Sequence, residues 1–344
     1  MELIIKPTEK CNFKCTFCSS PKLTQDSKKL LSLDKVFSFL KRFPNTNTII
    51  VNGGDPLMVD PQYYWKILDY FAEHNLTTTL SFTSNLWAFY KNPKTWIQLF
   101  QHKQVGICTS FNYGNTRKVT DSLVYTEALF WKVSDLFLNE VGYRPNFISV
   151  ISDENEEQAI DNVYLAKEMN VECKLNYAMA SGRQSKPYLK GKIYKTYIDI
   201  IKEGLHPWEY NSKQILLKQS SLSTTCPLNT ECDSTIRCLQ PEGDYYSCGS
   251  FGDDKEFPIS FEAEVMQNNF FTPLRNEMDL LSMKSDCFAC PLFSICNGCK
   301  KTVRDVKNHD MVEEHCSLMQ NNMADLVELM SGKNKTFNQS DILL

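Results

Sequence analysis

Residues 11–18 read CNFKCTFC and directly follow ELIIKPTEK at 2–10, which opens with a run of β-forming residues. The three cysteines, Cys11, Cys15 and Cys18, are separated by three and then two residues. A structural zinc site takes four ligands, so this loop would have to borrow a fourth ligand from elsewhere. A four-iron cluster held by three thiolates instead leaves one iron open to a small ligand. We favour the cluster and keep the zinc loop as the alternative.

Strands and helices alternate from this loop to about residue 180. The pattern predicts strands at 2–6, 47–52, 77–85, 105–113, 146–151 and 171–178, and helices at 33–43, 61–74, 93–102, about 121–140 and 156–170. Such alternation predicts an α/β fold with a parallel sheet or barrel. Polar residues gather where the strands end, at Asn52, Ser84, Asn85, Ser110 and Asn176. In (β/α) barrels the chemistry takes place at this edge.

The cysteines favour metal binding over disulfides. Of the fourteen, three lie at 11–18 and nine between Cys226 and Cys316, while only Cys108 and Cys173 occupy the middle. The N-terminus has no signal-peptide pattern and no apolar run is long enough to span a membrane. We therefore predict a cytoplasmic protein with metal-bound thiolates. The net charge of −4 gives no electrostatic argument for tight nucleic-acid binding.

CNFKCTFC resembles the CxxxCxΦC motif of the radical S-adenosylmethionine (radical SAM) enzymes. The resemblance implies that the open iron binds S-adenosylmethionine, whose cleavage gives a 5′-deoxyadenosyl radical that removes a hydrogen atom from substrate. It also places Phe17 beside that iron. We therefore expect a partial (β/α)6 TIM-like barrel followed by a small cysteine-rich iron–sulfur domain.

Further segments resemble cofactor-binding motifs of the same family. NGGDP, with Gly53, Gly54 and Asp55, resembles the GGEP motif that holds the methionine amino group, with Asp in place of Glu. Ser84 and Asn85 correspond to contacts with the methionine carboxylate or the ribose, and Ser110 to a ribose contact. Arg183 in SGR suits the carboxylate by bidentate pairing. Turn formation and strand-end capping are the alternative roles for these residues.

The C-terminal cysteines resemble the SPASM domain, which binds two auxiliary [4Fe–4S] clusters, and their spacing is most similar to that of anaerobic sulfatase-maturating enzymes. The resemblance implies interleaved ligands: Cys226, Cys232, Cys248 and Cys299 for one cluster, and Cys287, Cys290, Cys296 and Cys316 for the other. The cofactors expected are S-adenosylmethionine and three [4Fe–4S] clusters. Without the N-terminal loop, the run 287–299 would favour a zinc ribbon. One spacing departs from the SPASM pattern: two residues separate Cys296 from Cys299, where three are commoner.

The expected organisation is a barrel at 1–185, a helical linker at 186–215, the SPASM-like domain at 216–331 with a hairpin near 238–248, and a polar tail at 332–344. A last helical stretch covers about 309–331. Two cysteines outside the ligand sets, Cys238 and Cys108, are candidate hydrogen-atom donors, although a small buried residue is the simpler interpretation. Cys108 has the parity of Ser110 and is expected to point into the barrel, whereas Cys173 is expected to face the helices.

Three functions remain open. The first is oxidation or cross-linking of a peptide or protein side chain, with the auxiliary clusters as electron conduits and a flavodoxin or ferredoxin as donor. The second is radical modification of a nucleoside or nucleic-acid base, which Trp87, Phe89 and Tyr90 could stack. The third is a non-catalytic iron–sulfur or zinc protein. Sulfatase-maturating enzymes carry an acid directly after the ligand equivalent to Cys248, where this chain has Gly249, which argues against formylglycine formation. No leader-binding domain is expected before the barrel.

Overall fold

The computed structural model describes residues 1–20, 29–217, 232–267, 274–296 and 299–331. Its framework is one eight-stranded sheet in the order β6-β5-β4-β3-β2-β1-β7-β8. The first six strands are β1 (Glu2–Ile5), β2 (Thr48–Val51), β3 (Thr79–Thr83), β4 (Val105–Ser110), β5 (Asn146–Ile151) and β6 (Cys173–Tyr177). All five neighbouring pairs among them are parallel, which confirms the predicted α/β fold.

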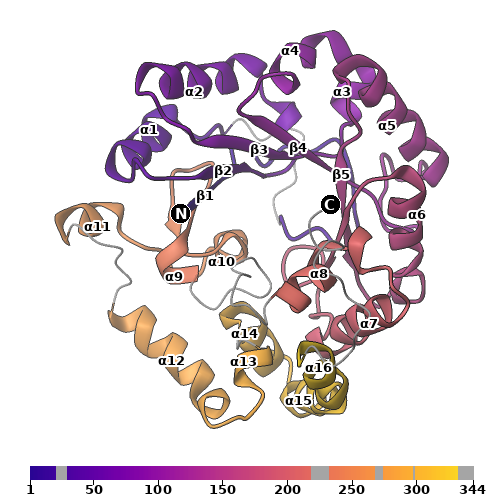
Figure 1. The fold of residues 1–344 in the computed structure, drawn as a ribbon. Coiled ribbons are helices and arrows are strands. Elements are labelled where there is room, and N and C mark those ends of the chain that lie inside the picture. The colour runs from indigo at the N-terminus through magenta and orange to yellow at the C-terminus, as the bar shows by residue number, and fades with distance from the viewer. Residues whose placement is uncertain (21–28, 218–231, 268–273, 297–298, 332–344) are drawn as a thin grey trace.

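Helices lie along the outer side of the curved sheet (Figure 1). They are α1 (Leu33–Arg42), α2 (Pro61–Glu73), α3 (Trp87–Lys91), α4 (Ile97–Phe100), α5 (Glu127–Val141), α6 (Asp161–Met169), α7 (Lys190–Lys202) and α8 (Tyr210–Leu217), with 3₁₀ turns η1 (Pro56–Met58), η2 (Pro93–Thr95), η3 (Glu156–Gln158) and η4 (His206–Trp208). The helix predicted at 93–102 is the turn η2 followed by the short α4. The helical linker predicted at 186–215 contains α7, η4 and most of α8, and α3 was not predicted.

The start of α5 differs from the prediction for a local reason. The sequence predicted a helix from about 121, whereas α5 begins at Glu127. Thr126 caps it, because its side chain accepts a hydrogen bond from the Leu129 backbone at 3.4 Å. Gly142 ends the helix in the left-handed conformation at φ 102°. Residues 121–126, which the sequence assigned to the helix, instead belong to the long connection between β4 and α5, and the earlier part of that connection carries Arg117.

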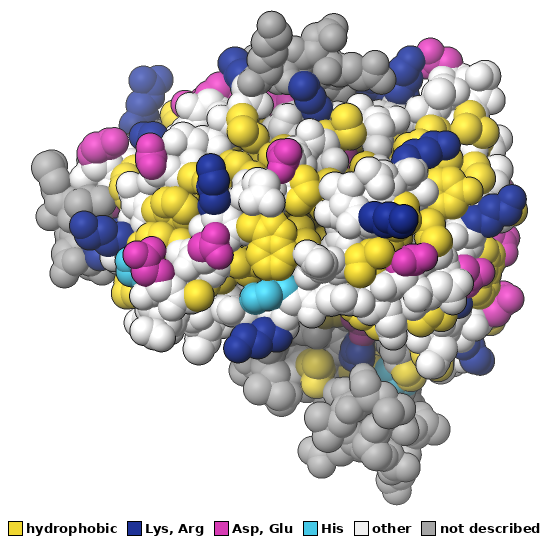
Figure 2. Space-filling model, turned by 90° about the horizontal axis from the view of Figure 1, so that it is seen from above, with side chains coloured by type: hydrophobic (Ala, Val, Ile, Leu, Met, Phe, Trp, Pro, Cys, Tyr) yellow, Lys and Arg dark blue, Asp and Glu magenta, His cyan; other side chains and the backbone are white. Residues whose placement is uncertain are grey.

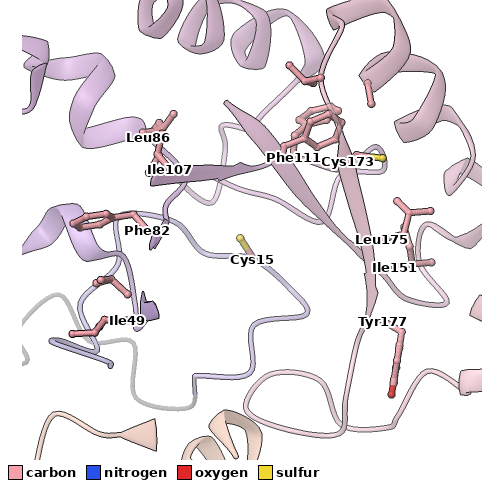
Figure 3. Packing of buried hydrophobic residues seen from close by; sticks show 14 of the residues in the cluster. Cys15, Ile49, Phe82, Leu86, Ile107, Phe111, Ile151, Cys173, Leu175 and Tyr177 are labelled. Carbon is pink, nitrogen blue, oxygen red and sulfur yellow. The ribbon is translucent and has the colours of Figure 1, made fainter. Parts of the chain in front are cut away.

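The pleat of the sheet separates an apolar outer face from a more polar inner face. Alternate residues such as Leu3, Ile49 and Phe82 are fully buried against the helices. Figure 3 shows Ile49, Phe82 and Ile151 pointing outward, with Cys15 on the concave side of the sheet. Residues of the opposite parity therefore face inward, including Asn52, Cys108, Ser110 and Asn176.

The C-terminal segment adds two strands to the same sheet. The predicted hairpin is present as β7 (Ile236–Leu239) and β8 (Tyr245–Tyr246). Its position was not predicted: β7 pairs in parallel with β1, with Cys238 opposite Ile4. A strand from the cysteine-rich segment therefore lies beside the strand that leads into the three-cysteine loop.

The remaining helices are α9 (Cys232–Thr235), α10 (Gly249–Asp254), α11 (Phe261–Gln267), α12 (Leu274–Phe288), α13 (Phe293–Cys296), α14 (Lys300–Asn308), α15 (Val312–Asn321) and α16 (Met323–Met330). Helices α13 to α16 lie across the open side of the curved sheet (Figure 1). The helix predicted at 309–331 is divided into α15 and α16, and α12 was not predicted. No helix in the described ranges is long and apolar enough to cross a membrane.

Candidate cluster and cofactor site

The three-cysteine loop crosses the carboxyl edge of the sheet on the concave side. Two backbone hydrogen bonds fix its course, from Lys14 to the Lys118 carbonyl at 2.7 Å and from Thr16 to the Thr116 carbonyl at 2.9 Å. The thiols of Cys11, Cys15 and Cys18 lie close enough to influence one another's ionisation.

The chemistry of the three thiols fits a cluster that supplies positive charge. Burial raises the pKa of Cys18 to about 11, and burial together with Asp55 raises the pKa of Cys11 further. Without metal both groups are therefore protonated thiols, and cluster binding releases their protons. In the described part of the chain, no three His, Cys, Asp or Glu residues are close enough to surround one metal ion. A four-iron cluster places each thiolate on a different iron, so its ligands stand further apart than those of a single ion.

Glycines hold the loop at both ends. Before Cys11, the Gly54 backbone donates to the Thr8 carbonyl at 2.9 Å, and a Cβ on Gly54 would overlap the carbonyls of Glu9 and Lys10. After Cys18, Gly182 has φ +62°, and a Cβ there would stand 2.6 Å from the Ser19 carbonyl oxygen. Only glycine permits these approaches. The predicted GGDP and SGR motifs are thus brought together around the loop, one at each end.

Asp55 ties the second and third strand ends together. Its buried carboxylate accepts hydrogen bonds from the Leu57 backbone at 2.9 Å, the Ser84 hydroxyl at 3.0 Å and the Asn85 backbone at 2.9 Å. Burial raises the pKa of Asp55 to about 6 despite these bonds. The side-chain amide of Asn85 donates to Asn12 inside the loop at 2.7 Å. These contacts orient the predicted cofactor-binding residues toward the cysteine loop, and their contacts with a cofactor remain a prediction.

The inner face beside this network carries polar groups with unused hydrogen-bonding capacity. The side-chain oxygen of Asn52, directly before Gly53, is buried and has no hydrogen-bond partner among the described residues. Buried polar atoms normally have a hydrogen-bond partner, so we expect a bound polar molecule to donate to the Asn52 oxygen. Ser110 ends β4 on the same face and is 8% exposed.

Two arginines lie beside the cysteine loop, and sequence reasoning selected only the more exposed one. Arg183 is exposed, and its guanidinium donates to the Cys15 carbonyl at 3.4 Å. Arg117 is buried, lies 4.9 Å over the Phe17 ring, and donates to the Asn112 side chain at 2.6 Å. Burial lowers the pKa of Arg117, while Cys15, Cys18 and Cys11 act to raise it. No sequence signal marked Arg117, because its segment was predicted as a plain connection before a helix.

The described C-terminal thiols form two groups by their effects on one another's ionisation, and the interleaved ligand sets stay a prediction. Cys248 and Cys299 are the residues directly before α10 and α14, and burial and then Cys299 raise the pKa of Cys248. Cys287, Cys290, Cys296 and Cys316 form the other group: burial, then Cys296 and Cys316, raise the pKa of Cys287. Cys232 starts α9 and lies near Cys299, since both act on Lys284. The predicted ligand Cys226 lies outside the described residues.

A buried ionic network joins the cysteine loop to α10 and α14. Asp253 pairs with Lys6, at the end of β1, and accepts a hydrogen bond from Ser19 at 2.9 Å. Asp254 accepts from Ser181 at 2.6 Å and from Arg304 at 2.5 Å. Both acids that follow Gly249 on α10 are therefore engaged by the barrel or by α14.

The three remaining cysteines are placed on different faces. Cys173 is fully buried in the apolar cluster with Leu175, as predicted (Figure 3). Cys108 faces inward near Lys174, and burial raises its pKa to about 12. Cys238 is fully buried in β7, and the Gln240 amide donates to its sulfur at 3.6 Å.

Comparison with solved structures identifies this architecture. The native enzyme anSMEcpe, an anaerobic sulfatase-maturating enzyme bound to AdoMet (S-adenosylmethionine) and the Cp18Cys peptide, has a TM-score of 0.69 at 18% identity, over 96% of this chain and 99% of its own. Streptococcus suis SuiB bound to its precursor peptide SuiA has a TM-score of 0.58 at 16% identity, over 86% of this chain and 70% of its own. The chain has the fold of these two proteins.

The fold agrees with the resemblance found in the motifs, since SuiB has also been solved with S-adenosylmethionine, at a TM-score of 0.56. No family model and no curated protein sequence matches this chain. At these identities the similarity establishes the fold, and residue roles rest on the geometry described above.

Proposed function

We propose that this protein is a radical SAM enzyme that modifies a peptide or protein side chain. The observation that carries the proposal is the loop of Cys11, Cys15 and Cys18, held by glycines against the Asp55 network on the concave side of the sheet. Neighbours with this fold bind S-adenosylmethionine and peptides. When bound, the three-thiolate cluster and S-adenosylmethionine supply reductive cleavage and a 5′-deoxyadenosyl radical.

The chain's own residues would bind and orient the cofactor. Gly53 and Gly54 let the backbone after β2 pack closely against the loop, and Asn52 offers an unpaired acceptor for the methionine amino group. Arg117 and Arg183 are the guanidinium groups available for the carboxylate. Ser110 on the inner face suits the ribose. The Phe17 ring lies 4.9 Å from the Arg117 guanidinium, next to the loop.

The C-terminal cysteines would hold two further clusters, in the interleaved sets predicted from the sequence. Four thiolates for each cluster leave no open iron, so we assign these clusters to electron transfer rather than substrate binding. A flavodoxin or ferredoxin is the class of donor we propose. Gly249 and the engaged Asp253 and Asp254 support a reaction other than formylglycine formation.

The structure counts against the stacking surface suggested for a nucleoside substrate. Phe89 is fully buried and packs on Phe137 at 5.0 Å. Trp87 is packed edge-on against Phe13 at 6.2 Å and stacks on Tyr90 at 5.2 Å. These rings are occupied by contacts within the barrel, so a peptide substrate is the better proposal.

The test is anaerobic reconstitution followed by iron analysis and turnover. We expect about twelve irons per chain from three four-iron clusters, and 5′-deoxyadenosine after addition of S-adenosylmethionine and reductant. Cys15→Ala should abolish 5′-deoxyadenosine formation, while Cys173→Ala, on the outer face, should retain it. A wild-type protein that binds iron but never forms 5′-deoxyadenosine would overturn the proposal. Mass spectrometry of candidate peptides and nucleosides after incubation then separates the two substrate classes.

A further inference from the structure

Two buried lysines lie among the C-terminal cysteines. Lys190 opens α7 and is fully buried, and Lys284 on α12 is 9% exposed. Lys190 donates to the carbonyl of Cys296 and lies 5.3 Å over the Tyr194 ring. Lys284 lies 5.7 Å over the Phe293 ring, and no carboxylate in the described ranges pairs with it. Buried ammonium groups are costly unless negative charge lies nearby.

The negative charge available to these lysines comes from both cysteine groups. Burial lowers the pKa of Lys284, and Cys299, Cys232 and Cys287 act in the opposite direction. Cys299 and Cys232 belong to one proposed cluster and Cys287 to the other, so thiols of both groups act on Lys284. Lys190 contacts the backbone carbonyl of Cys296 in the second group. The ring of Tyr194 lies beneath Lys190, and Cys299 of the first group acts to raise the pKa of Tyr194.

The two lysines flank the second cysteine group. Lys190 contacts the backbone of Cys296. Lys284 lies over Phe293, which stands between Cys290 and Cys296 in the chain. His315 is buried in the same region, with its Nε2 atom 3.6 Å from the Cys296 sulfur.

We propose that Lys190 and Lys284 raise the reduction potential of the auxiliary cluster assigned to Cys287, Cys290, Cys296 and Cys316 by compensating its negative charge. This inference rests on the proposed function, because it requires that the cysteine groups hold clusters. Four thiolates outweigh the positive charge of an iron–sulfur core, and reduction adds one more negative charge. A buried cation stabilises the reduced state more than the oxidised state, and burial strengthens the effect because it limits screening by water.

Redox titration of the cluster-loaded chain, monitored by electron paramagnetic resonance, tests this role. We expect Lys284→Met and Lys190→Met to disfavour reduction of an auxiliary cluster at least tenfold, which is a shift of about 59 mV to more negative potential for one electron. Lys284→Arg should retain most of the wild-type potential because it keeps the charge. Lys202→Met is the matched control, since Lys202 is half exposed and pairs with Asp325, and it should leave all potentials unchanged.

Iron content distinguishes failure of this inference from failure of the proposed function. About twelve irons per chain with unchanged potentials in Lys284→Met would overturn the charge-compensation role while leaving the clusters in place. A wild-type chain that reproducibly binds about four irons would overturn the auxiliary clusters and this inference with them. If Lys190→Met does not fold, Lys284→Met decides the outcome alone, because Lys284 lies over Phe293 between Cys290 and Cys296 of the second group.

Discussion

Lys6 and Asp253 form a buried ion pair that joins the end of the first strand to the helix after Cys248. Each side chain is 8% exposed. Asp253 also accepts a hydrogen bond from Ser19, the residue after Cys18. Burial acts to lower the pKa of Lys6, but Asp253 and the nearby thiols Cys238 and Cys248 raise it overall. One carboxylate thus connects the three-cysteine loop, β1 and the C-terminal segment.

Breaking this pair should destabilise the protein strongly. Lys6→Met leaves Asp253 buried without its cation, so we expect the free energy of unfolding to fall by about 3–5 kcal/mol, measured by guanidinium titration. The double variant Lys6→Met/Asp253→Asn should lose less than the sum of the single variants. The exposed pair Lys195–Asp199 is the control, and Lys195→Met should cost less than about 1 kcal/mol. If Lys6→Met lowered the free energy of unfolding by less than about 1 kcal/mol, the strong coupling between Lys6 and Asp253 would be contradicted.

Gly54→Ala should distort the cysteine loop, because its Cβ would overlap backbone carbonyls that cannot move aside. We expect a loss of about 3 kcal/mol in the free energy of unfolding and reduced iron at the first cluster. Gly106→Ala on β4 is the matched control, since nothing lies within 4 Å of a Cβ there. Thermal unfolding and iron per chain provide the measurements. Equal behaviour of the two variants would show that the loop tolerates the added methyl group.

Asp55 should make stability depend on pH in the acid range. Its folded pKa of about 6 lies above the ordinary value of 3.8, so between these values the folded state holds a proton that the unfolded state has released. The free energy of unfolding of the wild type, relative to Asp55→Asn, should therefore rise as the pH falls from 7 to 4, by about 2.4 kcal/mol. Urea titrations of both proteins across this range test the sign. If the difference in free energy of unfolding between the two proteins did not change with pH, the pKa of Asp55 would not be shifted in the folded state.

Cys238 should not be required for turnover as a hydrogen-atom donor. It is fully buried between β1 and β8, where it packs as a small apolar side chain. We expect Cys238→Ala to retain product formation with a stability loss of about 1 kcal/mol. Loss of product with 5′-deoxyadenosine formation retained would identify the thiol as a donor after all.

Cys108 requires a separate test because it faces the concave side of the sheet near Lys174. Its raised pKa keeps the sulfur protonated, which a hydrogen-atom donor also requires. We nevertheless expect Cys108→Ala to retain turnover, since the Cys108 thiol donates to the neighbouring Thr109 carbonyl at 3.7 Å. Product analysis by mass spectrometry, with deuterium incorporation from solvent as the second readout, checks this expectation.

Sequence reasoning succeeded where the signal is local. The alternation of strands and helices predicted the six strands β1 to β6, because alternating burial along a strand leaves a period of two in the residues. Sequence reasoning failed at the start of α5. The capping residue Thr126 is a weaker sign of a helix start than the apolar residues that precede it. Sequence reasoning also missed α12, whose exposed apolar residues Met278, Leu281 and Phe288 blur the helical pattern.

The sequence alone determined the chemistry that this chain can carry: three closely spaced thiols, a Gly-Gly turn after the second strand, and two sets of cysteines near the C-terminus. These depend on residue type and spacing, which the chain fixes before it folds. The tertiary structure alone decided which distant residues share a site. Pairing of β7 with β1 placed Lys6 against Asp253, and the packing of α7 and α12 placed Lys190 and Lys284 among the thiols. Such contacts join residues far apart in the chain and follow from burial of the whole sheet, so no local pattern encodes them.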